Sequence, residues 1–264
     1  MTCHLEYDQL PSLPNSILLA AWPGMGYVAY RAANFLVQAL EAKEFATLQG
    51  TDLFPLESVM VRDGLLQPPQ NPLNCFYYVD RQENGRDLVI FLGESQPVSG
   101  KGRELAGAVL DIAEKTGCSL VVTFAAYATH ISHTQQHAVW AASSEPSLNR
   151  ELGKYDIKIM PEGNISGLNG TLLAVAHERG FRSTCLLGEI PLYALQIEYP
   201  KASLVILEKF KEISEIDLDL KNLVTLTGST ARQIDGYLAQ LRNIGELSPG
   251  IPDDGDDPEI QTLH

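Results

Sequence analysis

The stretch Ile17–Leu36, "ILLAAWPGMGYVAYRAANFL", carries the pattern that decides the fold. Its first five residues are apolar, and with Ser16 they predict a short buried strand. From Tyr27 the apolar residues change to helical spacing, which predicts a helix. Between them lies the glycine turn Trp22-Pro-Gly-Met-Gly26. A strand, a turn and a helix in this order are typical of a layered α/β fold.

The same alternation continues over most of the chain. Runs such as "DLVIFL" and "SLVVTF" are apolar without interruption, so we expect strands that helices cover on both faces of a mostly parallel sheet. Strands are predicted at 16–21, 44–49, 57–61, 74–80, 87–93, 119–126, 155–160 and 182–188, and helices from 27 and at 101–116, 143–152, 171–180, 199–213 and about 229–244.

Composition and charge limit the classes of partner. The net charge of the 264-residue chain is −14, and an acidic tail contributes only part of it. Nucleic acids and anionic membranes require a basic surface, so neither is an expected partner. We expect a single α/β domain at 1–247 and a disordered tail at 248–264. The four widely spaced cysteines, and the lack of a secretory signal or a membrane-spanning run, predict a cytoplasmic protein.

Four predicted loops follow strands or precede a helix, where ligands bind in such sheets. They are 22–26, 93–97, 162–170 and 188–193. Glycines let backbone N–H groups approach a ligand, and a helix N-terminus favours an anion. A carboxylate in such a place can hold a sugar hydroxyl or act as a base, although helix capping is commoner. The ligand-binding candidates are therefore Gly24, Gly26, Glu94, Gly163, Asn164, Gly167, Gly170 and Glu189.

The first loop has two remaining interpretations. Gly24-x-Gly26-x-x-Ala29 matches a dinucleotide fingerprint as a pattern, but Trp22 and Pro23 separate it from the strand. The nearest acid at the required distance, Glu44, would begin the second strand rather than end it. The loop is then either a tight turn that packs a helix on a strand or a pocket for a small anion. No cofactor is expected.

Histidines and serines give no firm catalytic or metal site. His130, His133 and His137 would share one face of a helix and could bind zinc, but the segment follows a strand directly. We therefore expect solvated or partner-facing histidines and no metal. No nucleophile elbow is present, because Ser166 has the wrong spacing, so catalytic residues are not assigned. The apolar segment Leu192–Pro200 is a candidate core or subunit contact.

Taken in order, several motifs resemble the proteasome assembly chaperone 2 family, in its bacterial and archaeal form of uncharacterised function. They are "PG-x-G-x-V-x-x-x-A" after the first strand, "GESQP", "G-x-I-x-G-x-x-G-x-L-L" and "P-x-Y-x-x-x-x-x-Y-P-x-A", within about residues 15–225. The resemblance implies a three-layer α/β/α sandwich similar to nucleoside phosphorylases and related hydrolases. It also implies self-association and, for eukaryotic members, a chaperone role in building the proteasome α-ring.

Two functions stay open from the sequence. The first is a non-enzymatic, self-associating binding or chaperone-like protein that engages itself and another protein complex. The second is a phosphorylase- or hydrolase-type enzyme that binds a small anionic or nucleoside-like ligand at the glycine loops. Fold analogy supports the second only weakly, because one fold hosts unrelated functions.

Overall fold

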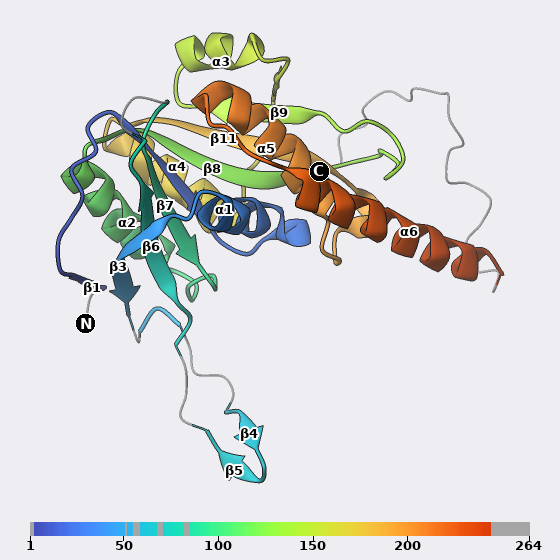
Figure 1. The fold of residues 1–264 in the computed structure, drawn as a ribbon, viewed down its shortest axis with the longest axis horizontal. Coiled ribbons are helices and arrows are strands. Elements are labelled where there is room, and N and C mark those ends of the chain that lie inside the picture. Colours follow the sequence, from blue (N-terminus) through green and yellow to red (C-terminus); the bar gives the residue numbers. More distant parts are fainter. Residues whose placement is uncertain (1–2, 51, 55–58, 68–70, 82–84, 244–264) are drawn as a thin grey trace.

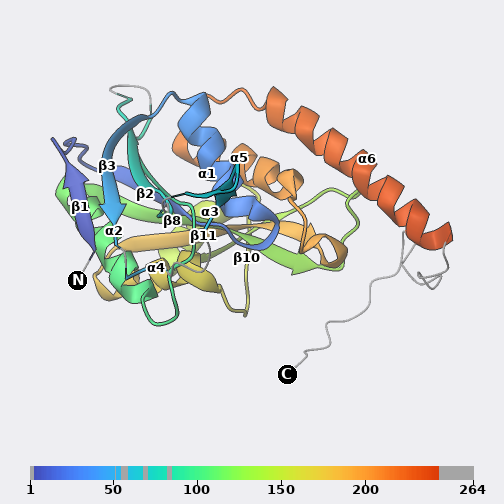
Figure 2. The same ribbon diagram turned by 90° about the horizontal axis from the view of Figure 1, so that it is seen from below.

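The computed structural model describes residues 3–50, 52–54, 59–67, 71–81 and 85–243. A mixed sheet lies at its centre, with helices on both faces (Figures 1 and 2). The predicted tail 248–264 lies outside the described residues. The strands are β1 (His4–Tyr7), β2 (Ser16–Ala21), β3 (Lys43–Gln49), β6 (Asn74–Val79), β7 (Leu88–Gly93), β8 (Cys118–Thr129), β9 (Val139–Ser143), β10 (Lys158–Ile159) and β11 (Arg182–Pro191), with a separate hairpin of β4 (Val61–Arg62) and β5 (Leu65–Leu66).

The strand order across the sheet is β1-β3-β6-β7-β2-β8-β11-β9-β10. The central strands β7, β2, β8 and β11 pair in parallel, as do β9 and β10. The ladders that β6 makes with β3 and β7 are antiparallel, and so are β1 with β3 and β11 with β9. The α/β class is confirmed, and the sheet is more mixed than the sequence predicts.

Strand β2 divides its side chains between two cores. Ile17 and Leu19 face one core, and Leu18, Ala20 and Trp22 face the other. Every residue of β2 is buried, because helices cover both faces of the sheet there. The uninterrupted apolar run in the sequence reflects this double burial.

The helices form the two outer layers. One face of the sheet carries α1 (Val28–Ala39), α3 (Pro146–Gly153), α5 (Pro200–Ser214) and α6 (Lys221–Asn243), and the other carries α2 (Gly102–Thr116) and α4 (Gly167–Glu178). Short 3-10 turns, η1 (Met25–Tyr27) and η2 (Leu192–Ala194), precede α1 and α5. Among the described residues, none of the helices has both the length and the apolar character needed to cross a membrane.

Several boundaries differ from the sequence prediction. Helix α4 begins at Gly167 rather than near residue 171, and α6 begins at Lys221 rather than near residue 229. Strand β11 continues through Gly188 to Pro191, because β8 is long enough to pair with it as far as Thr129. Strands β1 and β9 were not predicted, since β1 is short and mostly polar and β9 is only five residues long.

Gly170 is expected to be required for folding. A Cβ atom at this position would lie 1.9 Å from the backbone oxygen of Ile165, which must therefore move. We expect Gly170→Ala to lower the free energy of unfolding by about 1–3 kcal/mol, as overpacking usually does. Urea denaturation measures the change.

Gly236→Ala is the matched control. Gly236 also lies inside a helix, but a Cβ there would meet no heavy atom within 4 Å. Because alanine has the higher helix propensity, this variant should gain about 0.5–1 kcal/mol. Equal stability changes in both variants would show that the Ile165 contact does not constrain position 170.

Candidate functional site

The predicted loops meet at one end of the sheet. Because β2, β7, β8 and β11 run in parallel, the segments that follow them emerge at the same edge. The loop 22–26 follows β2, the loop 93–97 follows β7, and η2 follows β11. The fourth loop, 162–170, comes to this edge by a side-chain contact.

Gln96 joins three of these loops. Its Nε2 donates a hydrogen bond to the backbone oxygen of Pro23 at 2.9 Å, and its Oε1 accepts one from the N–H of Leu168 at 3.0 Å. Leu168 lies in the first turn of α4, where a backbone N–H has no partner inside the helix. The amide of Gln96 therefore holds "WPGMG" and the start of α4 against "GESQP". The sequence predicts a loop at "GESQP", but nothing in the local pattern singles out Gln96.

The candidate glycines have close packing contacts. Gly26 has a φ of +60°, and a Cβ on it would lie 2.6 Å from Cδ1 of Ile190. Gly167 has a φ of +70° at the start of α4, and Gly170 carries the Ile165 contact described above. Of the two interpretations of the first loop, the geometry favours a tight turn that packs α1 against the sheet.

The remaining loop candidates differ in the space around them. A Cβ on Gly24 would approach only Nδ2 of Asn169, at 4.0 Å. A Cβ on Gly163 would lie 2.9 Å from Sδ of Met160, and Asn164 is exposed. The predicted role of these residues in binding a ligand stays a prediction.

The two candidate carboxylates hold backbone and side-chain N–H groups of the protein. Glu189 is buried in β11, where its Oε2 accepts a hydrogen bond from the N–H of Ala138 at 2.8 Å and its Oε1 accepts one from Nε1 of Trp140 at 2.9 Å. Glu94 is exposed, and its Oε2 accepts the N–H of Leu73 at 2.9 Å. Neither carboxylate caps a helix. Glu189 joins β11 to β9, and Glu94 secures the residue before β6.

The histidine segment is an ordered loop rather than a helix. His130 is exposed, whereas His133 and His137 are buried, so the expectation of solvated histidines is wrong for these two. The Nδ1 of His133 lies 2.7 Å from the hydroxyl of Tyr193, and its Nε2 lies 2.9 Å from Oδ1 of Asp235 in α6. His133 therefore connects η2 with the long last helix. Within the described chain, no three metal-ligating side chains gather into a cluster.

His137 has a defined tautomer. Its Nδ1 lies 2.9 Å from the backbone oxygen of Gln135, which only accepts, so Nδ1 carries the proton. Its Nε2 is then the acceptor for the hydroxyl of Tyr199, 2.8 Å away. Burial lowers the pKa of His137 to about 4, because desolvation disfavours the charged imidazolium.

Exposed apolar side chains lie at the same edge, beside the glycine turn. The N–H of Tyr199 donates a hydrogen bond to the oxygen of Gly26 at 2.9 Å, which holds the segment after β11 against η1. We name this surface the loop platform; its residues are Met25, Tyr27, Leu192, Tyr193 and Ile197. Each of these five residues is between 39% and 49% exposed.

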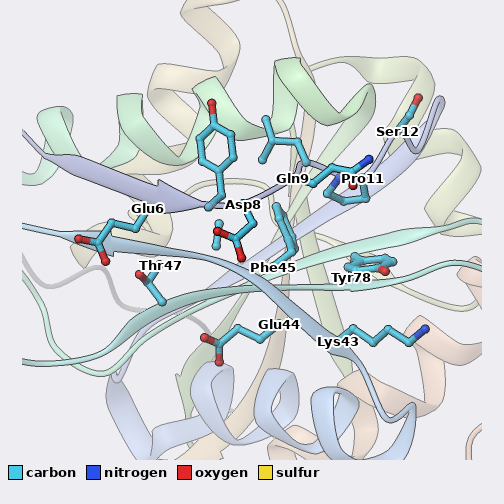
Figure 3. A pocket seen from close by; sticks show the side chains of 13 residues that line it. Glu6, Asp8, Gln9, Pro11, Ser12, Lys43, Glu44, Phe45, Thr47 and Tyr78 are labelled. Carbon is cyan, nitrogen blue, oxygen red and sulfur yellow. The ribbon is translucent and has the colours of Figure 1, made fainter.

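A large hollow lies elsewhere, beside β1 and β3 at one side of the sheet (Figure 3). It has a volume of about 760 Å³ and is bordered by the segment after β1 and by β3. Glu6, Asp8 and Glu44 line it together with Lys43. The hollow runs along β3 from Lys43 to Thr47, and no residue of the four loops borders it. None of the predicted site residues borders it.

Comparison with known proteins assigns the chain to a family. The model of the PAC2 family matches residues 18–238. The chain belongs to the PAC2 family. An uncharacterized protein of Methanocaldococcus jannaschii is 27% identical over 220 residues, which are 83% of this chain and 81% of the relative. The resemblance noted in the sequence is thus confirmed.

Solved structures of similar proteins confirm the fold. PbaB of Pyrococcus furiosus, an archaeal proteasome activator, has a TM-score of 0.75 at 24% identity and aligns over 91% of this chain and 99% of PbaB. The monoclinic form of PbaA from the same organism, an archaeal homolog of proteasome-assembly chaperone, has a TM-score of 0.71 at 22% identity over 93% of this chain and 95% of PbaA. A Mycobacterium tuberculosis proteasome-assembly chaperone homologue also has 0.71, at 18% identity over 84% and 95%. The likeness to nucleoside phosphorylases stays a prediction.

Loss of the Glu189 carboxylate should destabilise the protein. Glu189→Ala leaves the N–H of Ala138 and Nε1 of Trp140 without an acceptor in a partly buried place, and each unpaired buried donor costs about 1–3 kcal/mol. We expect the free energy of unfolding to fall by roughly 2–5 kcal/mol in urea denaturation. Glu162→Ala, at an exposed glutamate, is the control. A Glu189→Ala variant as stable as the control would contradict the structural role of this carboxylate.

His137 should make stability depend on pH. Its pKa is lowered in the folded state, so between about pH 6.5 and 4 the unfolded chain binds a proton that the folded protein does not. Stability is therefore lost as the pH falls through this window. We expect His137→Gln to flatten the loss by an amount on the order of 2 kcal/mol in urea titrations at several pH values. Identical pH slopes for both proteins would exclude this contribution.

Proposed function

We propose that this PAC2-family chain is a non-enzymatic, self-associating binding protein that acts as an assembly chaperone for subunits of a larger protein complex in the cytoplasm. The loop platform carries the proposal. Protein interfaces are enriched in aromatic residues and methionine and depleted of charge at their centres. The platform has this composition, with Met25, Tyr27 and Tyr193 beside two aliphatic residues.

The platform is also held in a fixed shape, which favours binding. The hydrogen bond from Tyr199 to Gly26 joins its two segments, and the hydroxyl of Tyr193 is held by Nδ1 of His133 at 2.7 Å. A surface that is ordered before binding pays less conformational entropy when a partner arrives. The segment Leu192–Pro200, a candidate subunit contact from the sequence, supplies three of the five platform residues.

Two structural neighbours support a proteasome as the partner complex. PbaB is an archaeal proteasome activator, and PbaA is a homolog of proteasome-assembly chaperone. We therefore propose that the partner complex is a proteasome core particle or its unassembled subunits. The four cysteines are free thiols, which is compatible with the reducing cytoplasm.

The alternative function, a phosphorylase- or hydrolase-type enzyme, is less favoured. It requires Glu94 or Glu189 to receive a ligand hydroxyl near the glycine loops. The carboxylate of Glu189 is buried, and each of its oxygens already accepts a hydrogen bond from the protein. The glycines Gly26 and Gly170 also serve close packing. A polar ligand at these places would have to displace existing contacts.

Charges introduced on the platform should weaken self-association. Burial of one aliphatic side chain is worth about 1.5–3 kcal/mol, and 1.4 kcal/mol is a factor of ten in Kd. We expect Leu192→Asp combined with Ile197→Asp to raise the dissociation constant of self-association at least tenfold, measured by native mass spectrometry over a dilution series. The same samples, mixed with proteasome core subunits of the same organism, report binding to the partner complex.

Val224→Asp is the control for these variants. Val224 is an exposed apolar residue, at 52%, near the start of α6 and outside the platform. This variant should associate like the unmodified chain. A chain that is monomeric at every concentration and binds no proteasome subunit would refute the proposed function. An unchanged dissociation constant in the double variant would show that the platform takes no part in self-association.

A further inference from the structure

The β4–β5 hairpin is an exposed apolar arm. Figure 1 shows it standing clear of the sheet and the helices. Leu66 is 75% exposed and Leu65 is 68% exposed, and the neighbouring Met60 and Val61 are also more than half exposed. Monomeric proteins seldom leave apolar side chains grouped on their surface, and such groups mark sites of association.

Both faces of the hairpin are uncovered. Val61 pairs with Leu66, so these two side chains share one face, whereas Leu65 pairs with Arg62 and lies on the other. All of these residues are exposed. A two-stranded hairpin alone is marginally stable in water, and a covering surface would stabilise it.

The turn of the hairpin fixes its shape. Asp63 and Gly64 form a two-residue connection, and both have positive φ, 52° and 78°. Two positive φ values are the requirement of a type I′ turn, whose twist matches that of the paired strands. The arm is thus preorganised for docking, and little entropy is lost when a surface receives it.

Charge indicates which surface receives the arm. The chain carries a net charge of −14, so two copies repel each other over most of their surfaces. The stretch 59–66 is neutral, with Arg62 and Asp63 as its charged residues, and the platform stretches 22–27 and 190–197 hold no charged residue. A contact between arm and platform brings together one neutral stretch, whose Arg62 and Asp63 have opposite charges, and two uncharged stretches, so the copies repel each other least there. A basic partner would instead be attracted to the acidic surface elsewhere.

The positions of arm and platform suit a contact between copies. The hairpin comes after β3 and before β6, at the edge of the sheet where β2 and β11 also end. Both apolar surfaces therefore lie at one end of the molecule. We propose that the β4–β5 hairpin of one copy docks on the loop platform of a second copy. This inference rests on the proposed self-association and identifies its contact.

The contact is heterologous, since the arm of one copy meets a different surface of the next. Such contacts close into a ring when the rotation between copies allows it, whereas in a two-fold dimer the same contact would occur twice and the whole interface would be isologous. Leu65 and Leu66 are the anchors in this arrangement, and Leu192 and Ile197 line the receiving surface. Because the two surfaces have different residues, a cross-link can report which of them meet.

Cysteine cross-linking tests the contact. Leu66→Cys and Leu192→Cys are made singly in a Cys3→Ser background, because the three other cysteines are buried. One protein is labelled with ¹⁵N, and the two are mixed and oxidised with copper phenanthroline. We expect a disulfide-linked pair of one labelled and one unlabelled chain, identified by mass spectrometry, and at least a tenfold lower yield from either protein alone.

A matched pair controls for random collisions. Val224→Cys replaces Leu192→Cys in a second mixture, and its yield should stay at the level of the single proteins. Cross-linking of Leu66→Cys with itself at the yield of the mixture would overturn the inference in favour of a hairpin-to-hairpin contact. An oligomer in native mass spectrometry without the 66–192 cross-link would overturn it and leave the proposed function standing, whereas a strict monomer would overturn both.

Discussion

The burial of β2 on both faces is the constraint on which the other features depend. A strand with no face toward solvent requires helices on both faces of the sheet. Helices α1 and α5 cover one face, and α2 and α4 cover the other. The chain must then leave the carboxyl end of β2 and turn back at once into α1. Gly26 suits this turn, since its φ is +60° and a Cβ there would lie 2.6 Å from Cδ1 of Ile190. The position of the platform follows from that turn.

The polar groups at this edge mainly organise the protein itself. Gln96 holds two loops and a helix start with a single amide, and the carboxylate of Glu189 holds β9 against β11. Buried polar groups of this kind cost free energy unless they are paired, so their partners fix the local geometry. Part of what this leaves toward solvent is the apolar loop platform, beside exposed polar residues such as Glu94 and Asn164. A surface with the composition of a protein interface is therefore produced by the same turns that a search for ligands would select.

The sequence could predict the layers because the apolar runs are long and uninterrupted. It also located the loops that meet, since parallel strands end at a common edge. It could not assign Glu189, because a glycine followed by a glutamate after a strand looks the same whether the strand ends there or continues. The continuation of β11 depends on the length of β8, far away in the chain. Likewise, the partners of His133 and His137 come from η2, α6 and Tyr199, which local spacing does not reveal.

The hairpin has a further consequence through its place in the topology. Strands β3 and β6 pair directly with each other, and β4 and β5 come between them in the chain without joining the main sheet. A change in the length or sequence of this insertion leaves the register of every other strand as it is. Selection can thus alter the arm freely while the fold is conserved, so closely related chains can acquire different association partners on an unchanged scaffold.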